Sequence, residues 1–127
     1  MIKKEISKSV VELRANLSRT ARVEEWARLM GYTCPKKFAR KFLRYFSTRP
    51  RRILKYIRLQ SISQQLRENN RSNFEIAQWH GIPDEIALNK FINYHLNCSP
   101  TDLKEMPEEE LRERLKKSVV NNGSKNR

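Results

Sequence analysis

The feature of this sequence that most constrains its fold is a repeat with a period of 50 residues. Residues 25–31 (EWARLMG) are matched by residues 75–81 (EIAQWHG). Identical or similar residues stand 50 positions apart, without a gap, at Glu25/Glu75, Ala27/Ala77, Gly31/Gly81, Phe38/Leu88, Arg40/Lys90, Phe42/Ile92, Phe46/Leu96, Pro50/Pro100 and Ile53/Leu103. Self-similarity at a fixed period indicates that one supersecondary unit occurs twice.

The first copy of the repeat predicts two helices joined by a short turn. Gly31 suits a left-handed cap at the end of the first helix. Pro35 suits the first turn of the second helix, because its missing N–H needs no partner there. Phe38, Phe42 and Phe46 recur every four residues, so they share the face that packs on the core. Helix, short turn and helix together are the outline of a helix-turn-helix motif.

The second copy predicts the same outline at the same spacing. We expect a helix over 74–80, a turn at 82–84 and a helix from 85 to about 96. Asn97 can take the left-handed cap of that helix. A short helix over 101–106 follows, and Pro107 ends it.

The remaining segments also predict helices, so the fold class is all-α. The apolar residues Ile6, Val10, Leu13 and Leu17 predict a first helix of three or four turns. Apolar positions from 53 to 66 predict a long linker helix over 50–68. We therefore expect a first helix-turn-helix unit over 1–68, a second over 69–106, and a charged helix with a disordered tail over 107–127.

The charge of the chain points to a polyanionic partner. Its formal net charge is +13 and its isoelectric point is about 10.2. No Asp or Glu occurs from residue 26 to residue 67, a span that holds 12 Lys and Arg residues. A field of one sign this dense repels itself unless an anion neutralises it. Nucleic acid is the usual partner, and an anionic membrane is the lesser alternative.

Several other classes of protein do not fit the sequence. No run of about 18 apolar residues and no secretory signal is present, so we expect a cytoplasmic, nucleoid-associated protein without a membrane partner. His80 and His95 lack a nucleophile or a paired carboxylate at motif spacing, so we expect no enzyme. Cys34 and Cys98 have no zinc spacing, and no metal or cofactor is expected.

The outward faces of the two second helices supply the candidate DNA contacts. The candidates for base contacts lie near the helix starts, where side chains can reach base edges in the major groove: Lys36, Lys37, Arg40, Ile86, Asn89, Lys90 and Asn93. The candidates for phosphate contacts would position the protein without reading sequence: Thr33, Lys41, Arg44, Arg49, Arg51, Arg52 and Lys55.

Over residues 6–106 the chain resembles the DNA-binding domain of the AraC/XylS family of bacterial transcription regulators. The family signature in the second unit is Ile-Ala, Gly-Phe, Phe-x-Arg-x-Phe, Gly-x-x-Pro and an aromatic followed by a basic residue. Its places are taken here by Ile76-Ala77, Gly81-Ile82, Leu88-x-Lys90-x-Ile92, Asn97-x-x-Pro100 and Leu103-Lys104. The first unit is similar at Gly31-Tyr32, Phe38-x-Arg40-x-Phe42, Ser47-x-x-Pro50, Ile53 and Arg58. Ser47 and Asn97 replace glycine, and Leu88, Ile92 and Leu103 replace aromatics.

The resemblance implies a sequence-specific regulator that binds double-stranded DNA. Its two recognition helices would enter successive major grooves, and one monomer would cover about two turns. Members of the family are typically transcription activators that contact RNA polymerase. Most carry a further ligand-binding or dimerisation domain, and this chain resembles the short, stand-alone members or a fragment of a longer one. The alternative is a helical adaptor that binds nucleic acid without sequence preference or binds RNA polymerase.

Overall fold

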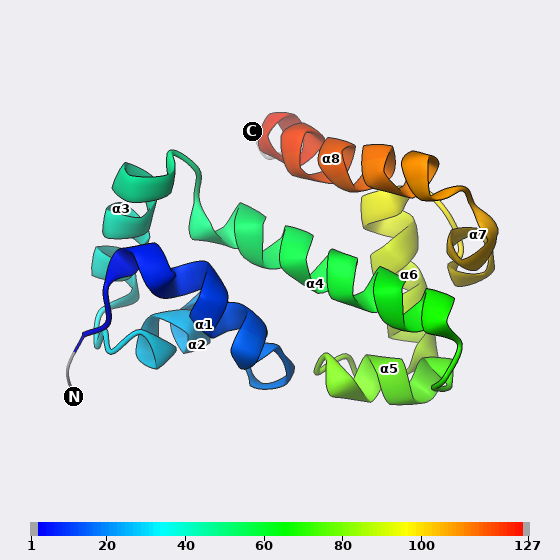
Figure 1. Cartoon of the computed structure of the whole chain (residues 1–127), viewed down its shortest axis with the longest axis horizontal. Helices are drawn as coiled ribbons and strands as arrows, with labels where there is room; N and C mark the ends of the chain where they lie inside the picture. The colour runs from blue at the N-terminus through cyan, green and yellow to red at the C-terminus, as the bar shows by residue number, and fades with distance from the viewer. Residues whose placement is uncertain (1–2, 126–127) are drawn as a thin grey trace. The chain divides into compact units, whose positions relative to one another are not determined.

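The computed structural model describes the backbone of residues 3–125 and the side chains of residues 3–119. This described part contains helices and no strand, which confirms the all-α class (Figure 1). No helix in it is both long and apolar enough to cross a membrane. The chain divides into two compact units, residues 1–55 and residues 56–127, and the boundary falls inside helix α4 (Pro50–Glu68).

The 50-residue period of the sequence is also a period of the backbone. Helices α2 (Val23–Leu29) and α3 (Pro35–Phe46) recur as α5 (Asn73–Trp79) and α6 (Glu85–Leu96), and each bound is shifted by 50. The turns match in their hydrogen bonds as well. The N–H of Tyr32 donates to Ala27 O at 2.9 Å, and that of Ile82 donates to Ala77 O at 2.8 Å.

The left-handed caps predicted at Gly31 and Asn97 are confirmed, and Gly81 and Ser47, for which no cap was predicted, also have positive φ. Gly31 and Gly81 have φ of 90° and 72°, a region that glycine enters without strain. Ser47 and Asn97 close α3 and α6 in the left-handed conformation, with φ of 61° and 57°. After each, a proline begins the next helix: Pro50 begins α4 and Pro100 begins α7 (Pro100–Glu105).

An aromatic cluster fills the core of the first unit. Trp26, Phe38 and Phe42 are all 0% exposed, and the Trp26 ring lies 5.5 Å and 5.0 Å from the two phenylalanine rings. The Nε1–H of Trp26 donates to the carbonyl of Ser9 at 3.0 Å, which ties α2 to α1 (Ser9–Ala15). The Phe stripe of the sequence is therefore a core face, although Phe46 is only half-buried.

The prediction of one N-terminal helix of three or four turns is wrong in detail. The segment is three short pieces, η1 (Ile6–Lys8), α1 (Ser9–Ala15) and η2 (Leu17–Arg19), where η denotes a 3₁₀ helix. The hydroxyl of Thr20 donates to the backbone carbonyl of Asn16. The side-chain amide of Asn16 donates to the backbone carbonyl of Glu12. Such local side-chain bonds compete with the regular helix ladder.

The core of the second unit is aliphatic and draws on five helices. Leu59, Ile62 and Leu66 of α4 pack with Ile76, Leu88, Ile92, Leu96 and Leu103 in one buried cluster. Leu111 and Leu115 of α8 (Glu108–Lys125) join it. Residues 56–68 and α8 therefore belong with the second unit, whereas the sequence assigned 56–68 to the first unit and set 107–127 apart.

Helix α8 is longer than the sequence predicted. We expected a disordered tail after Lys117, but the helix continues to Lys125, and residues 126 and 127 lie outside the described part. Ser118 is buried, and its hydroxyl donates to the carbonyl of Leu115 at 2.7 Å. Leu111, Leu115 and Ser118 therefore share one packed face, which carries the helix past the predicted end.

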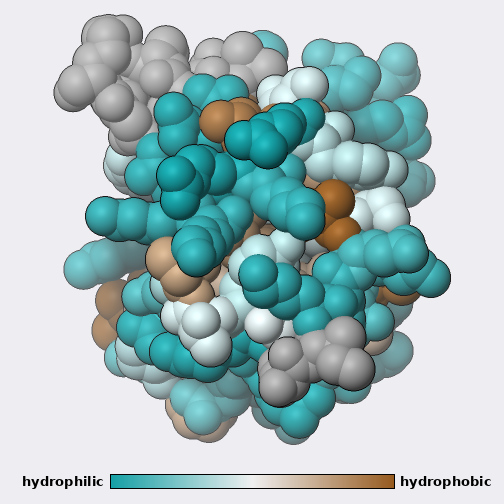
Figure 2. Space-filling model, turned by 90° about the vertical axis from the view of Figure 1, so that its left-hand side faces the viewer, coloured by the Kyte–Doolittle hydropathy of each residue, from teal (hydrophilic) through white to brown (hydrophobic). Residues whose placement is uncertain are grey.

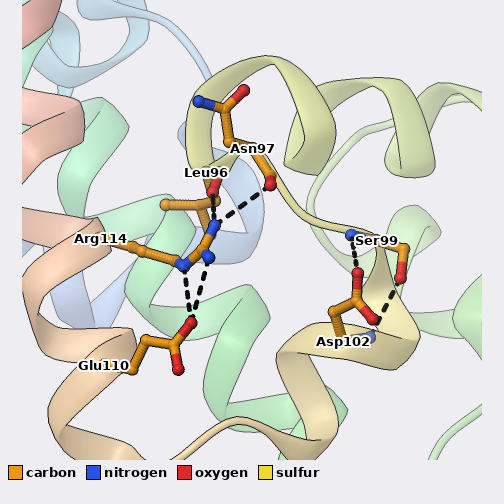
Figure 3. A network of polar contacts seen from close by, with 6 residues as sticks. All are labelled: Leu96, Asn97, Ser99, Asp102, Glu110 and Arg114. Carbon is orange, nitrogen blue, oxygen red and sulfur yellow. Dashed lines mark hydrogen bonds and ion pairs between the residues drawn. The ribbon is translucent and has the colours of Figure 1, made fainter.

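Arginines hold the carboxyl ends of helices in the second unit. Arg114 Nη1 donates to the carbonyls of Leu96 and Asn97 at 2.8 and 3.1 Å, and its Nη2 pairs with Glu110 at 3.0 Å (Figure 3). Arg67 Nη1 donates to the carbonyls of Leu103 and Met106 at 2.9 and 2.8 Å. The last carbonyls of a helix have no partner within that helix. The two arginines supply donors to these carbonyls.

Replacing Arg114 with alanine is expected to destabilise the second unit by about 1–3 kcal/mol, because two carbonyls lose a charged donor. Urea unfolding followed by circular dichroism measures the loss. Arg112→Ala is the matched control, because Arg112 is exposed on the same helix, and a change within about 0.5 kcal/mol is expected. Equal effects of the two substitutions would contradict a capping role for Arg114.

His80 is buried at the end of α5 and is neutral at pH 7. Its pKa is lowered from 6.5 to about 4, first by burial and then by the charge of Arg58. Its Nε2 lies 3.3 Å from Gln65 Oε1, while its buried Nδ1 has no partner. The imidazole is thus a packed group at the end of α5.

The stability of the second unit is therefore expected to fall as the pH falls from about 6.5 to about 4. In that window the unfolded chain binds a proton that the folded chain does not, so the stabilisation is complete above pH 6.5 and is lost below. The full effect is about 3 kcal/mol, of which about 1 kcal/mol is lost between pH 7 and 5.5. Urea unfolding at these two pH values measures it. A His80→Gln variant with the same pH dependence would contradict this assignment.

Candidate nucleic-acid interface

The outward face of α3 consists largely of cations. Lys36, Lys37, Arg40, Lys41 and Arg44 are all exposed, and the face opposite them is fixed by the buried Phe38 and Phe42. Within residues 3–125, no cation of α3 forms an ion pair with Asp or Glu. The face is therefore available to an anion that comes from outside the chain.

The arrangement of these cations costs the helix stability. Lys36, Arg40 and Arg44 lie four residues apart, and like charges at that spacing repel each other. Lys36 and Lys37 stand in the first turn, which contains no acidic residue, where they oppose the helix dipole. The aromatic core offsets this cost. A charge pattern that weakens its own helix is more readily explained by an external anion than by folding.

Cys34 stands at the start of the same helix. Its pKa is lowered, first by the backbone N–H of Lys37. Burial, the second-largest contribution, raises the pKa, and the N–H of Lys36 and the charges of Lys37 and Arg40 lower it further. The field at this end of α3 therefore favours a negative charge, as it would favour a phosphate.

The candidates for phosphate contacts flank this face in the same unit. Thr33, Arg49 and Arg51 are exposed, as are Lys41 and Arg44 of α3. Arg52 and Lys55, in the first two turns of α4, are half-buried. All seven phosphate candidates and three of the seven base candidates thus belong to the first unit.

The outward face of α6 has a different chemistry. Ile86, Asn89, Lys90 and Asn93 are all exposed, as the sequence predicted for base contacts, and Ile86 is 67% exposed. Tyr94 is also 64% exposed on this helix. Lys90 is the one Lys or Arg of α6. Amide, apolar and aromatic groups therefore dominate this face.

The two units differ sharply in charge. Residues 1–55 hold 16 Lys and Arg against 4 Asp and Glu, a net charge of +12. Residues 56–127 hold 11 against 10, a net charge of +1. Nearly all of the excess charge of the chain therefore belongs to the first unit. Figure 2, which views the molecule from the side of α1, α2 and α3, shows a mostly hydrophilic surface with small, separate apolar patches.

Two cations of the acid-free span turn inward. Arg58 Nη2 donates to the carbonyl of His80 at 2.6 Å, and its guanidinium lies 5.5 Å from the centre of the Phe91 ring. Arg67 binds the end of α7, as described above. A sequence signal for Arg58 exists, because it lies four residues from both Leu54 and Ile62, which are buried. A cation on an apolar stripe indicates a structural use.

The described residues contain no cluster of three His, Cys, Asp or Glu that could hold a metal ion. Comparison of the chain with protein-family models, curated proteins and solved structures finds no match.

Proposed function

We propose that the protein is a sequence-specific transcription regulator of the AraC type that binds double-stranded DNA. The observation that carries this proposal is the exposed, unpaired cation face of α3, held rigidly on an aromatic core. A major groove is about 12 Å wide and admits an α-helix, so α3 is the recognition helix of a first helix-turn-helix unit. The resemblance of residues 6–106 to that family agrees with this assignment.

The repeated geometry supports a second recognition helix. Helices α5 and α6 repeat α2 and α3 at a spacing of 50 residues, and their turns carry the same hydrogen bonds. In this proposal α6 enters the next major groove, and α4 is the linker helix between the two units. Successive grooves on one face of DNA recur about 34–36 Å apart, so one monomer covers about two turns.

The proposed contacts divide by chemistry. Lys36, Lys37 and Arg40 contact base edges in one groove, where Lys and Arg pair with guanine. Arg49, Arg51 and their neighbours hold phosphates and fix the register without reading sequence. Bound to DNA in the cytoplasm, the regulator would act as an activator through contact with RNA polymerase.

A second candidate is a helical adaptor that binds nucleic acid or RNA polymerase without sequence preference. The charge distribution favours it to a degree, because a unit with a net charge of +12 attracts any polyanion, RNA included. Steep salt dependence is common to both candidates, so sequence discrimination must decide between them.

The test is a selection of random duplexes of about 25 base pairs against the purified protein at physiological salt. The regulator predicts a motif with two blocks about one helical turn apart. A single block would remove α6 as a reader of bases. Tight binding without any motif, to duplex and RNA alike, would replace the regulator with the adaptor.

A further inference from the structure

The chemistry of the α6 face suggests which bases the second unit reads, if the proposed function holds. Glu85, in the first turn, and Tyr94 are exposed on this helix, and so are the four candidates for base contacts, Ile86, Asn89, Lys90 and Asn93. Asparagine pairs with the N6 and N7 positions of adenine, and an apolar side chain contacts the methyl group of thymine. Three of these four side chains therefore match an A·T pair, while Lys90 alone matches guanine.

The two asparagines are joined in the free protein. The Nδ2 of Asn93 donates to the backbone carbonyl of Asn89 at 2.9 Å and also to its side-chain Oδ1. These bonds leave the Nδ2 of Asn89 and the Oδ1 of Asn93 without a partner among the described residues. The pair thus offers one donor and one acceptor on one face. Adenine presents the complement in the major groove, with an acceptor at N7 and a donor at N6.

Little electrostatic affinity is available to the second unit. Its net charge is +1, and three of its arginines, Arg58, Arg67 and Arg114, donate to backbone carbonyls inside the unit. Phosphate neutralisation supplies most non-specific affinity for DNA, and it scales with the number of cations that contact the backbone. The first unit, with a net charge of +12, carries the cations needed for this non-specific affinity.

We infer that α6 reads an A·T-rich subsite and contributes base discrimination, whereas the first unit contributes most of the affinity and of its salt dependence. This inference rests on the proposed function, and it names the bases that the second unit would recognise. The two recognition helices are then unequal, with one block of the operator recognised by α3 through cations and the other by α6 through amide and apolar groups.

The inference is tested on the selected duplex, with the α3 block left unchanged. Exchanging A·T pairs for G·C pairs in the second block is expected to lower affinity by about 5- to 150-fold for each pair contacted. This measurement uses the unaltered protein, so no variant needs to fold.

A double variant, Asn89→Ala with Asn93→Ala, is the matching change in the protein. It should bind the A·T and G·C duplexes with nearly equal affinity, with the slope of log affinity against log salt unchanged. Lys104→Ala, an exposed position on α7, is the control and should keep full discrimination. Circular dichroism confirms the fold of each variant.

Four results would overturn the inference while leaving sequence-specific binding of DNA through α3 intact. The first is a second block rich in G·C pairs, and the second is a motif without a second block. The third is a double variant that still discriminates. The fourth is a double variant that loses affinity for every duplex with a smaller salt slope, which would make α6 a phosphate contact. A selection without any motif would instead overturn the proposed function.

Discussion

Replacing Arg40 with alanine is expected to weaken binding to the preferred duplex by about 1–3 kcal/mol and to relax base preference at one position of the operator. Arg40 is exposed in the second turn of α3, one turn after Lys36 and one turn before Arg44. A bidentate arginine–guanine contact explains both effects, because the guanidinium fits the O6 and N7 acceptors. Affinity measured on the selected duplex and on its single-base variants tests the prediction.

Arg51→Ala is the matched comparison, since Arg51 is also exposed and belongs to the same unit. It should weaken binding to all duplexes alike and reduce the salt slope by about one, as expected for a phosphate contact. If Arg40→Ala left affinity and preference unchanged, the assignment of α3 as a recognition helix would be wrong.

Replacing Trp26 with alanine is expected to destabilise the first unit by about 3–5 kcal/mol. The indole is 0% exposed, packs against both the Phe38 and the Phe42 ring, and donates to the Ser9 carbonyl. Domains of this size are stable by about 5–15 kcal/mol, so the loss removes much of the stability of this unit. Because α3 depends on this core, DNA affinity should fall with it.

Urea unfolding by circular dichroism measures the effect of Trp26→Ala, and the fluorescence of Trp79, in the other unit, reports whether the loss is local. Val11→Ala is a control for apolar truncation in the same unit, because Val11 is 68% exposed, and it should change stability little. A Trp26→Ala variant as stable as the Val11→Ala variant would contradict the described core.

Local sequence signals were sufficient for most of the fold. The four-residue spacing of Phe38 and Phe42 identified a core face, and both rings are buried. Gly31 and Asn97 were predicted as left-handed caps, and both have positive φ. These features depend on neighbours within a turn or two, so the sequence contains the information that determines them.

Features that depend on tertiary packing could not be predicted in the same way. The sequence does not show that Leu59 and Leu66 pack with α5–α8, so it placed the unit boundary at 68 instead of 55. It also ended the last helix too early, because the burial of Ser118 follows from the packing of α8. The N-terminal helix is divided where Asn16 and Thr20 bond to the local backbone.

The candidate site was predicted best where exposure follows from helix periodicity. All seven base candidates are exposed, because each lies on the face opposite a buried stripe. The roles of the arginines were less predictable. Arg58 and Arg67 belong to the acid-free span yet donate to carbonyls that are distant in the sequence. The unequal charge of the two units became apparent only once the unit boundary was known.

The central claim, that this chain reads the sequence of double-stranded DNA, is tested most directly by one ratio. The affinity for the selected duplex is divided by the affinity for a shuffled duplex of the same composition, at physiological salt. A specific reader predicts a ratio of about 10³–10⁷. A ratio near one would contradict the claim and leave a basic helical protein that binds nucleic acid by charge alone.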